Sequence, residues 1–189
     1  MLTHGNLTAL FHDLVRTAMA AQQVQSSETT EAYLVHLLEA FARPGPGGLL
    51  DQPLALDYLE SFNLPAARRY EKLKRVADTA LFVTGIFMES LERTLVGPDY
   101  YTALGRDAYA RLSTHASRSA LAGLFRELAR RFPEFVRVLT EISARDLFRT
   151  EQDTIRLYKR WLHTRGRREA DLLVRRGIIP FAPPTTQRH

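Results

Sequence analysis

The sequence predicts an all-α protein, and two features of the chain support this prediction. Apolar residues recur at intervals of three and four along most of the 189 residues, which is the spacing of one helical face. No run of strand length alternates between apolar and polar residues, and no internal repeat is visible. We expect a single-domain bundle of seven to nine helices over residues 1–182 and a disordered tail over residues 183–189.

The most apolar segment marks the helix around which the others should pack. Residues 79–88 carry no charge, and apolar side chains such as Phe82 and Ile86 lie opposite the apolar face that begins at Leu73. A helix that is apolar on all sides is normally buried on all sides. The uncharged segment is too short to span a bilayer, which takes about 20 apolar residues. We therefore predict a buried central helix over about residues 65–95.

Three helices are expected before the central helix. The first covers about residues 6–23, and the second begins near Ser27, a suitable N-cap, and ends at Arg43. The glycine- and proline-rich segment from Pro44 to Gly48 ends this helix, and we interpret it as a connector, with a moving lid as the alternative. A short third helix follows Pro53.

After the central helix the chain continues in helical segments separated by glycine or proline. Residues 99–113 form one of them, with the small Gly105 on its apolar side, where a neighbouring helix could approach closely. The next extends to Pro133, which should break or kink it, and the pattern then resumes to about Leu147. Two further helices are expected before Gly177, a residue type favoured at helix C-termini.

The composition is that of an ordinary globular protein without cysteine chemistry. Apolar residues make up 45% of the chain and charged residues 25%. Because there is no cysteine, disulfides, thiolate nucleophiles and cysteine-ligated metals are excluded. The first residues lack the basic and apolar regions of a secretory signal, so we expect a cytoplasmic protein.

The charge is distributed unevenly along the chain. The net charge is −5 over residues 1–64, +4 over residues 65–144 and +6 over residues 145–189. This asymmetry suggests an anionic partner for the C-terminal end or head-to-tail contact between copies. Solvated helix faces are the simpler explanation.

The sequence contains no recognisable metal, phosphate or hydrolase motif. None of the six histidines follows a glutamate by three positions, and no His-Glu-x-x-His helix occurs. A phosphate-binding loop and a Gly-x-Ser-x-Gly elbow are also missing. We therefore expect no metal and no cofactor, and we assign no catalytic residue. An enzyme whose site assembles from distant residues stays open.

One candidate site lies where polar residues adjoin the uncharged segment. Asp78 would need a partner if it were buried, because a buried carboxylate without one is costly. Tyrosine hydroxyls or an arginine from Tyr100 to Tyr109 are the expected partners. The cluster is either a small ligand pocket or a satisfied network that fixes helix packing. The candidate ligand-binding residues are Asp78, Thr84, Tyr100, Tyr101, Arg106 and Tyr109.

A second candidate site is a cationic stripe in the last quarter of the chain. Its members are Arg149, Arg156, Lys159, Arg160, Arg167 and Arg168. Such a stripe can follow the phosphates of a nucleic acid. Tyr158 and Trp161 have the spacing of core residues, however, which removes aromatic stacking on bases from this hypothesis.

Two segments carry a resemblance to a known family. They are Ala80-Leu-Phe-Val-Thr-Gly-Ile-Phe87 and Asp99-Tyr-Tyr-Thr-Ala-Leu-Gly-Arg-Asp-Ala-Tyr109. The chain resembles a family of uncharacterised all-helical bacterial proteins, and the resemblance covers most of its length. It implies a helical fold but no established activity.

These features together favour a non-enzymatic interaction or adaptor protein that binds a protein partner or itself. The acidic N-terminal third and the basic C-terminal quarter would make such contacts electrostatically complementary. Two alternatives remain: a helical bundle that binds a small molecule near Asp78 and Tyr101, and a nucleic-acid-associated factor that uses the C-terminal arginines.

Overall fold

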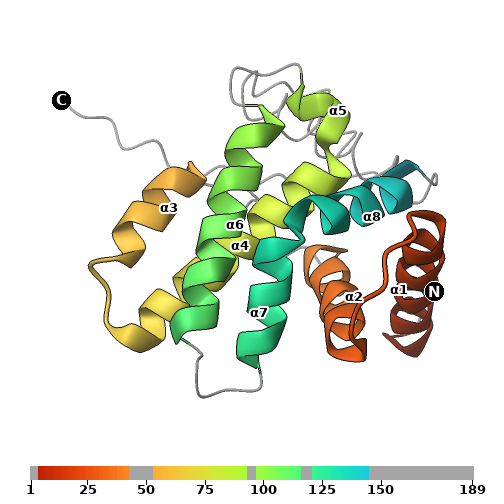
Figure 1. Ribbon diagram of the computed structural model, residues 1–189, viewed down its shortest axis with the longest axis horizontal. Coiled ribbons are helices and arrows are strands. Elements are labelled where there is room, and N and C mark those ends of the chain that lie inside the picture. The colour runs from red at the N-terminus through yellow and green to blue at the C-terminus, as the bar shows by residue number, and fades with distance from the viewer. Residues whose placement is uncertain (1–3, 43–52, 93–96, 116–120, 145–189) are drawn as a thin grey trace, which may run out of the picture. The chain divides into compact units, whose positions relative to one another are not determined.

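A computed structural model describes residues 4–42, 53–92, 97–115 and 121–144 of the chain. These residues form helices and include no strand, which confirms the all-α prediction (Figure 1). The chain divides into two compact units, Met1–Ser143 and Ala144–His189, and the description below concerns the first. The prediction of a single domain over residues 1–182 with a disordered tail stays a prediction, because residues 145–189 lie outside the described part.

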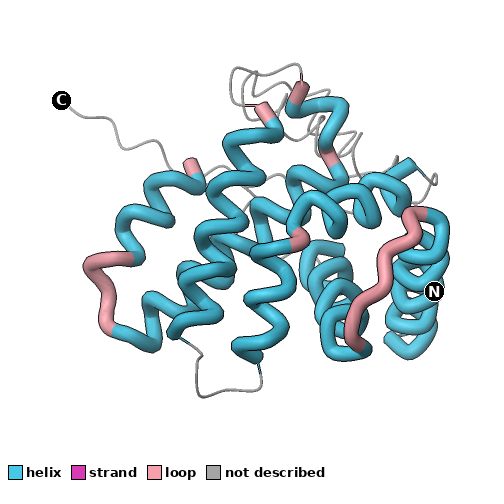
Figure 2. Tube along the Cα trace, viewed as in Figure 1, coloured by secondary structure: helices cyan, strands magenta, loops and turns pink. Residues whose placement is uncertain are grey.

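Helices follow one another along the described part of the chain. Their bounds are α1 (His4–Ala21), α2 (Glu28–Ala42), α3 (Leu54–Ser61), α4 (Ala66–Ile86), α5 (Met88–Leu91), α6 (Pro98–His115), α7 (Leu121–Arg130) and α8 (Phe132–Ala144). Figure 2 shows the loop of residues 22–27 that joins α1 to α2. None of the helices in the described part is long and apolar enough to cross a membrane. The segment from Pro44 to Gly48, predicted as a connector or lid, lies outside the described residues.

Helix α4 contains the predicted uncharged core. Every residue from 76 to 86 is buried, including Phe82 and Ile86, as expected for a helix that is apolar on all sides. The helix packs against α6 and α3, and also contacts α2. The most apolar segment of the chain therefore lies in the core, as its sequence predicts.

The predicted helix over residues 65–95 is divided in the structure. Helix α4 ends at Ile86, Phe87 leaves the helical conformation with φ −116° and ψ 23°, and α5 begins at Met88. Hydroxyl groups of α8 satisfy the carbonyls released there: Thr140 donates to the Gly85 carbonyl at 3.0 Å and Ser143 to the Ile86 carbonyl at 2.9 Å. Because these donors come from a different helix, the apolar spacing could not predict the break.

Two glycines allow close helix contacts. A Cβ placed on Gly85 would lie 2.3 Å from Leu139 Cβ, and one on Gly105 would lie 2.6 Å from the Phe132 ring and 2.9 Å from Ala80 Cβ. The predicted close approach at Gly105 is therefore confirmed. These contacts bring α8 against α4 and the start of α8 against α6.

The predicted break near Pro133 is also confirmed. Helix α7 ends at Arg130 and α8 begins at Phe132, so Pro133 lies in the first turn of α8, where its missing N–H costs least. Arg131 stands between the two helices. The described part of α8 ends at Ala144, and the predicted continuation to Leu147 lies outside it.

Candidate functional site

A polar cluster around Asp78 joins three helices. Asp78 Oδ1 accepts hydrogen bonds from the hydroxyls of Tyr33 on α2, at 2.5 Å, and Tyr109 on α6, at 2.7 Å. Asp78 Oδ2 pairs with Nζ of Lys74, one helical turn earlier on α4, at 2.6 Å. The carboxylate is buried, and both of its oxygens accept hydrogen bonds. Tyr109 confirms the expectation that a tyrosine or an arginine of the later helix would be a partner of Asp78.

The two tyrosines of this cluster are held as hydrogen-bond donors. Burial raises the pKa of the Tyr109 hydroxyl well above its ordinary range, and the charge of Asp78 raises it further. Burial and Asp78 raise the pKa of Tyr33 in the same direction. Neither hydroxyl can act as a tyrosinate base near neutral pH. The cluster therefore has the chemistry of a packing network, in which each donor already has its acceptor.

The other residues predicted for this site make contacts of their own. Thr84 is buried and donates to the Ala80 carbonyl of its own helix at 2.7 Å. The rings of Tyr100 and Tyr101 contact each other near the start of α6, with centroids 5.1 Å apart. Arg106 is exposed and donates to the Ala129 carbonyl at 3.3 Å. Among the predicted residues, Tyr109 is the one that contacts Asp78 directly. A ligand site formed by the full set stays a prediction.

Two members of the cluster were not predicted. Lys74 precedes Asp78 by four residues, the spacing at which side chains meet on one helix face, so this pair was available from the sequence. Tyr33 lies 45 residues before Asp78 on another helix, and no local pattern connects the two.

Asp78 lines neither of two shallow hollows on the described surface. One, of about 330 Å³, is lined by Leu64, Arg68, Glu71, Lys72 and Arg75. The other, of about 380 Å³, lies between α6 and α7 and is lined by Ala103, Arg106, Asp107, Ala110, Ala129 and Arg130. Both are open to solvent. No group of three metal-ligating side chains occurs among the described residues.

The polarity of helix α3 is partly inverted. Asp57 is 2% exposed and Ser61 is buried, whereas Leu56 and Leu59 are 49% and 57% exposed. Phe62 caps the helix with helical backbone angles and is also exposed. A buried charge and a group of exposed large apolar side chains are the departures from ordinary burial that carry information about function. We call Leu56, Leu59 and Phe62 the α3 outer face.

Ion pairs hold the inner side of α3 against α4. Lys72 Nζ lies 3.1 Å from Asp57 Oδ1 and 2.5 Å from a Glu60 carboxylate oxygen, and Arg75 Nη2 lies 3.9 Å from Asp57 Oδ2. Hydrogen bonds to Glu60 and then to Asp57 raise the pKa of Lys72. These pairs, with the buried Leu54, fix which side of α3 faces α4 and so leave the leucines outside.

A second polar group borders the α3 outer face on the α6 side. Arg111 Nε donates to the Tyr58 hydroxyl at 2.6 Å and to Asp107 Oδ2 at 2.7 Å. The Tyr58 hydroxyl also donates to Asp107. The Arg111 guanidinium lies 4.8 Å from the centre of the Phe62 ring, within the range of a cation–π contact. Phe62 is therefore held in place at one end of the face.

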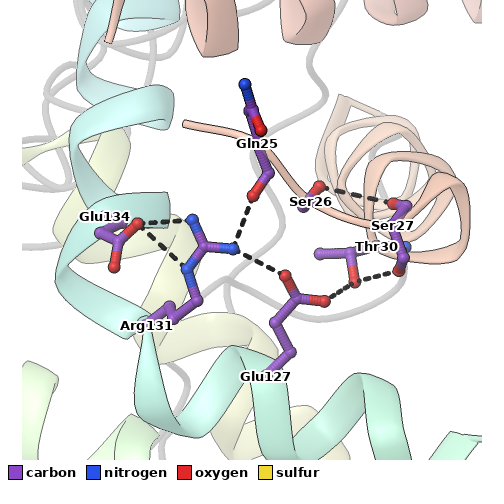
Figure 3. Close-up of polar contacts among 7 residues, drawn as sticks. All are labelled: Gln25, Ser26, Ser27, Thr30, Glu127, Arg131 and Glu134. Carbon is purple, nitrogen blue, oxygen red and sulfur yellow. Dashed lines mark hydrogen bonds and ion pairs between the residues drawn. The ribbon is translucent and has the colours of Figure 1, made fainter. Parts of the chain in front are cut away.

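A third polar network joins the α1–α2 loop to α7 and α8 (Figure 3). Arg131 donates to Glu134 at 2.6 Å, to Glu127 at 2.9 Å and to the Gln25 carbonyl at 2.6 Å. The other Glu127 oxygen accepts from Thr30 at 2.7 Å. Each of these charges has an opposite charge or a hydrogen-bond partner beside it, which is typical of a structural junction.

The cationic residues predicted for phosphate binding lie outside the described residues. They are Arg149, Arg156, Lys159, Arg160, Arg167 and Arg168. The structure therefore does not test the nucleic-acid hypothesis, and it stays a prediction.

The described residues thus form an all-α protein with two notable features. One is a buried polar cluster in which each hydrogen-bond donor has an acceptor, and the other is an apolar helix face exposed to solvent. Comparisons with protein-family models, curated proteins and solved structures found no match to this chain. The family resemblance of residues 80–87 and 99–109 stays a prediction.

Proposed function

We propose that this protein is an interaction protein that binds another protein through the α3 outer face, without chemistry of its own. One observation carries the proposal: α3 buries Asp57 and exposes Leu56 and Leu59. A helix that only completed the fold would turn its leucines inward, because burying each large apolar side chain stabilises a protein by about 1.5–3 kcal/mol. Contact with a partner would recover that free energy.

The position of α3 supports this proposal. The described helices that contact α3 lie on one side of it, where α4 and α6 pack (Figure 1). The ion pairs of Asp57 with Lys72 and Arg75 fix the helix in that orientation. The outer face is thus presented on a positioned helix, an arrangement that lowers the entropy lost on binding.

The other candidate functions have less support from the described residues. A ligand site at Asp78 would need polar groups directed at an empty space, but the carboxylate accepts three hydrogen bonds from within the protein. A tyrosinate acting as a catalytic base there would need a tyrosine pKa near neutral pH. Burial instead raises the pKa of both Tyr33 and Tyr109. Neither argument bears on the cationic residues after position 145.

Site-specific photo-crosslinking in the cells that produce the protein tests the proposal. A photoreactive phenylalanine analogue replaces Leu59 in the full chain, and in a matched control it replaces Leu121, which is 39% exposed on α7. We expect a discrete protein adduct from position 59 and not from position 121. Adding Leu56→Glu should abolish the adduct, because a charge would be buried in the contact.

Two outcomes would contradict the proposal. One is the absence of any adduct at position 59. The other is an identical set of adducts at positions 59 and 121, because random collisions at any exposed apolar position would then explain both.

A further inference from the structure

We propose that the partner bound by the α3 outer face is a second copy of this chain, so that two α3 helices pack antiparallel across a two-fold axis. This inference rests on the proposed function of the α3 outer face. It is carried by the symmetric spacing of the apolar residues and by the mixed charge on both edges of the face.

The apolar residues are arranged symmetrically about Leu59. Leu56 precedes it by three positions and Phe62 follows it by three, and the helical backbone angles of Phe62 continue the spacing of α3. In an antiparallel pair with its two-fold axis at Leu59, the two Leu59 side chains face each other. Leu56 of each copy then faces Phe62 of the other. An isologous contact requires such a self-complementary row.

Both edges of the face carry both signs of charge. On the α4 side, Glu60 has a side chain that is 58% exposed and pairs with Lys72. On the α6 side, Asp107 pairs with Arg111, and their side chains are 51% and 46% exposed. In the antiparallel arrangement each edge meets the same edge of the second copy, so that a carboxylate of one copy can approach a cation of the other.

This charge pattern favours a second copy over a strongly charged partner. A uniformly acidic segment would meet Glu60 and Asp107, and a uniformly basic one would meet Lys72 and Arg111. Like charges brought together at an interface are unfavourable and select against such partners. A surface with alternating signs is complementary to itself when a two-fold axis relates the two copies.

The small size of the face indicates a weak association. Stable interfaces bury about 800 Å² on each partner, and two side chains of an eight-residue helix with that of its C-cap residue provide less than that. We therefore expect a weak dimer whose population rises with protein concentration, rather than an obligate one.

Cysteine crosslinking of the purified full chain tests the inference. No other thiol can form a disulfide, because the sequence has no cysteine. Leu59→Cys places one thiol at the proposed two-fold axis, and Leu121→Cys places one thiol on α7 as the matched control. Under mild oxidation we expect Leu59→Cys to form a disulfide-linked dimer about tenfold faster or more, because dimerisation raises the local thiol concentration. Adding Leu56→Glu should reduce that rate to the rate of Leu121→Cys.

Equal crosslinking rates for the two cysteine variants, with circular dichroism showing both folded, would overturn the inference of a second copy. The photo-crosslinking adduct then separates this failure from failure of the proposed function. An adduct with the mass of two chains of 21.5 kDa supports the second copy. An adduct of another mass at position 59 overturns the second copy but retains protein binding by the α3 outer face.

Discussion

Asp78 has hydrogen-bond partners on three of the described helices. One buried carboxylate links Tyr33 of α2, Lys74 of α4 and Tyr109 of α6. A buried carboxylate that lost its donors would be strongly unfavourable, and a buried hydroxyl that lost its acceptor would also carry a desolvation cost. The members of the cluster should therefore depend on one another for stability.

The first prediction concerns the cost of removing members of this cluster. We expect Tyr109→Phe to lower the free energy of unfolding by about 1–2 kcal/mol and Asp78→Ala by about 3 kcal/mol. The double variant should lose about as much as Asp78→Ala alone, because both changes remove the same hydrogen bond. Urea unfolding measures these differences. Tyr100→Phe, at an exposed position on α6, is the control, and an equal cost for Tyr100→Phe and Tyr109→Phe would contradict the structural role of the cluster.

Residue by residue, the sequence predicted part of this cluster. The cost of burying a carboxylate predicted that Asp78 has a partner, and a tyrosine or an arginine of the later helix was the expected donor. Tyr33 could not be predicted, because helical periodicity shows which face of α2 is apolar but not which residue of α4 that face meets. Thr84 was predicted as a site residue, but its hydroxyl bonds within α4, as hydroxyls inside helices often do.

At the scale of the elements, close packing of α4 against α8 depends on Gly85. A side chain there would have to displace Leu139, which is itself buried. Overpacking of this kind commonly destabilises a core by about 1–3 kcal/mol, which exceeds the gain of about 1 kcal/mol from replacing glycine by alanine in a helix.

The second prediction is therefore a difference in sign between two glycine variants. Gly85→Ala should lower the unfolding midpoint, whereas Gly123→Ala on α7 should raise it, because nothing lies within 4 Å of a Cβ at position 123. Thermal unfolding followed by circular dichroism measures both. A stabilising Gly85→Ala would show that the helices are not packed as closely as described.

The junction between α7 and α8 leads to a third prediction, on pH. The hydrogen bond from Arg131 lowers the pKa of Glu134 below its ordinary value, which means that folding favours the ionised form. The resulting stabilisation is present above about pH 4.5, the ordinary pKa, and is lost as the pH falls through the folded-state pKa. Because Glu134 is close to solvent, the effect should be a few tenths of a kcal/mol.

The measurement compares the wild type with Glu134→Gln from pH 7 to pH 3 by urea unfolding. We expect the wild type to be slightly more stable at pH 7, and the difference to disappear by about pH 3. A difference that stays constant over this range would mean that the ion pair with Arg131 does not contribute. Glu28→Gln, at an exposed position in the first turn of α2, is a control for a general effect of removing one negative charge.

The orientation of α3 could not be predicted from its apolar spacing. Leu54, Leu56, Leu59 and Phe62 predict a helix, but they occur around much of its circumference and do not choose its inner side. The choice is made by the pairing of Asp57 with Lys72, which are 15 residues apart and lie on different helices. The strongest candidate surface therefore appears only when α3 and α4 are seen together.

For the molecule as a whole, the fold class was predictable because helical periodicity is a local property. The burial of residues 79–86 followed from the uncharged, apolar sequence of that segment and its helical spacing. The end of α4 at Ile86 did not, since it depends on Thr140 and Ser143 of α8. Features that one helix determines by itself, such as the burial of the uncharged segment, were predicted. The end of α4 and the partner Tyr33 of Asp78 depend on a second helix and were not predicted.

The central claim at this scale is that the α3 outer face joins two copies of the chain. Sedimentation velocity of the purified protein, over a range from about 1 µM to 1 mM, tests it most directly. We predict that the average mass of the wild type rises above 21.5 kDa with concentration, that Leu59→Glu stays at 21.5 kDa throughout, and that Leu121→Glu behaves like the wild type. A wild type that stays at 21.5 kDa at every concentration, or a Leu59→Glu variant that associates as the wild type does, would contradict the claim.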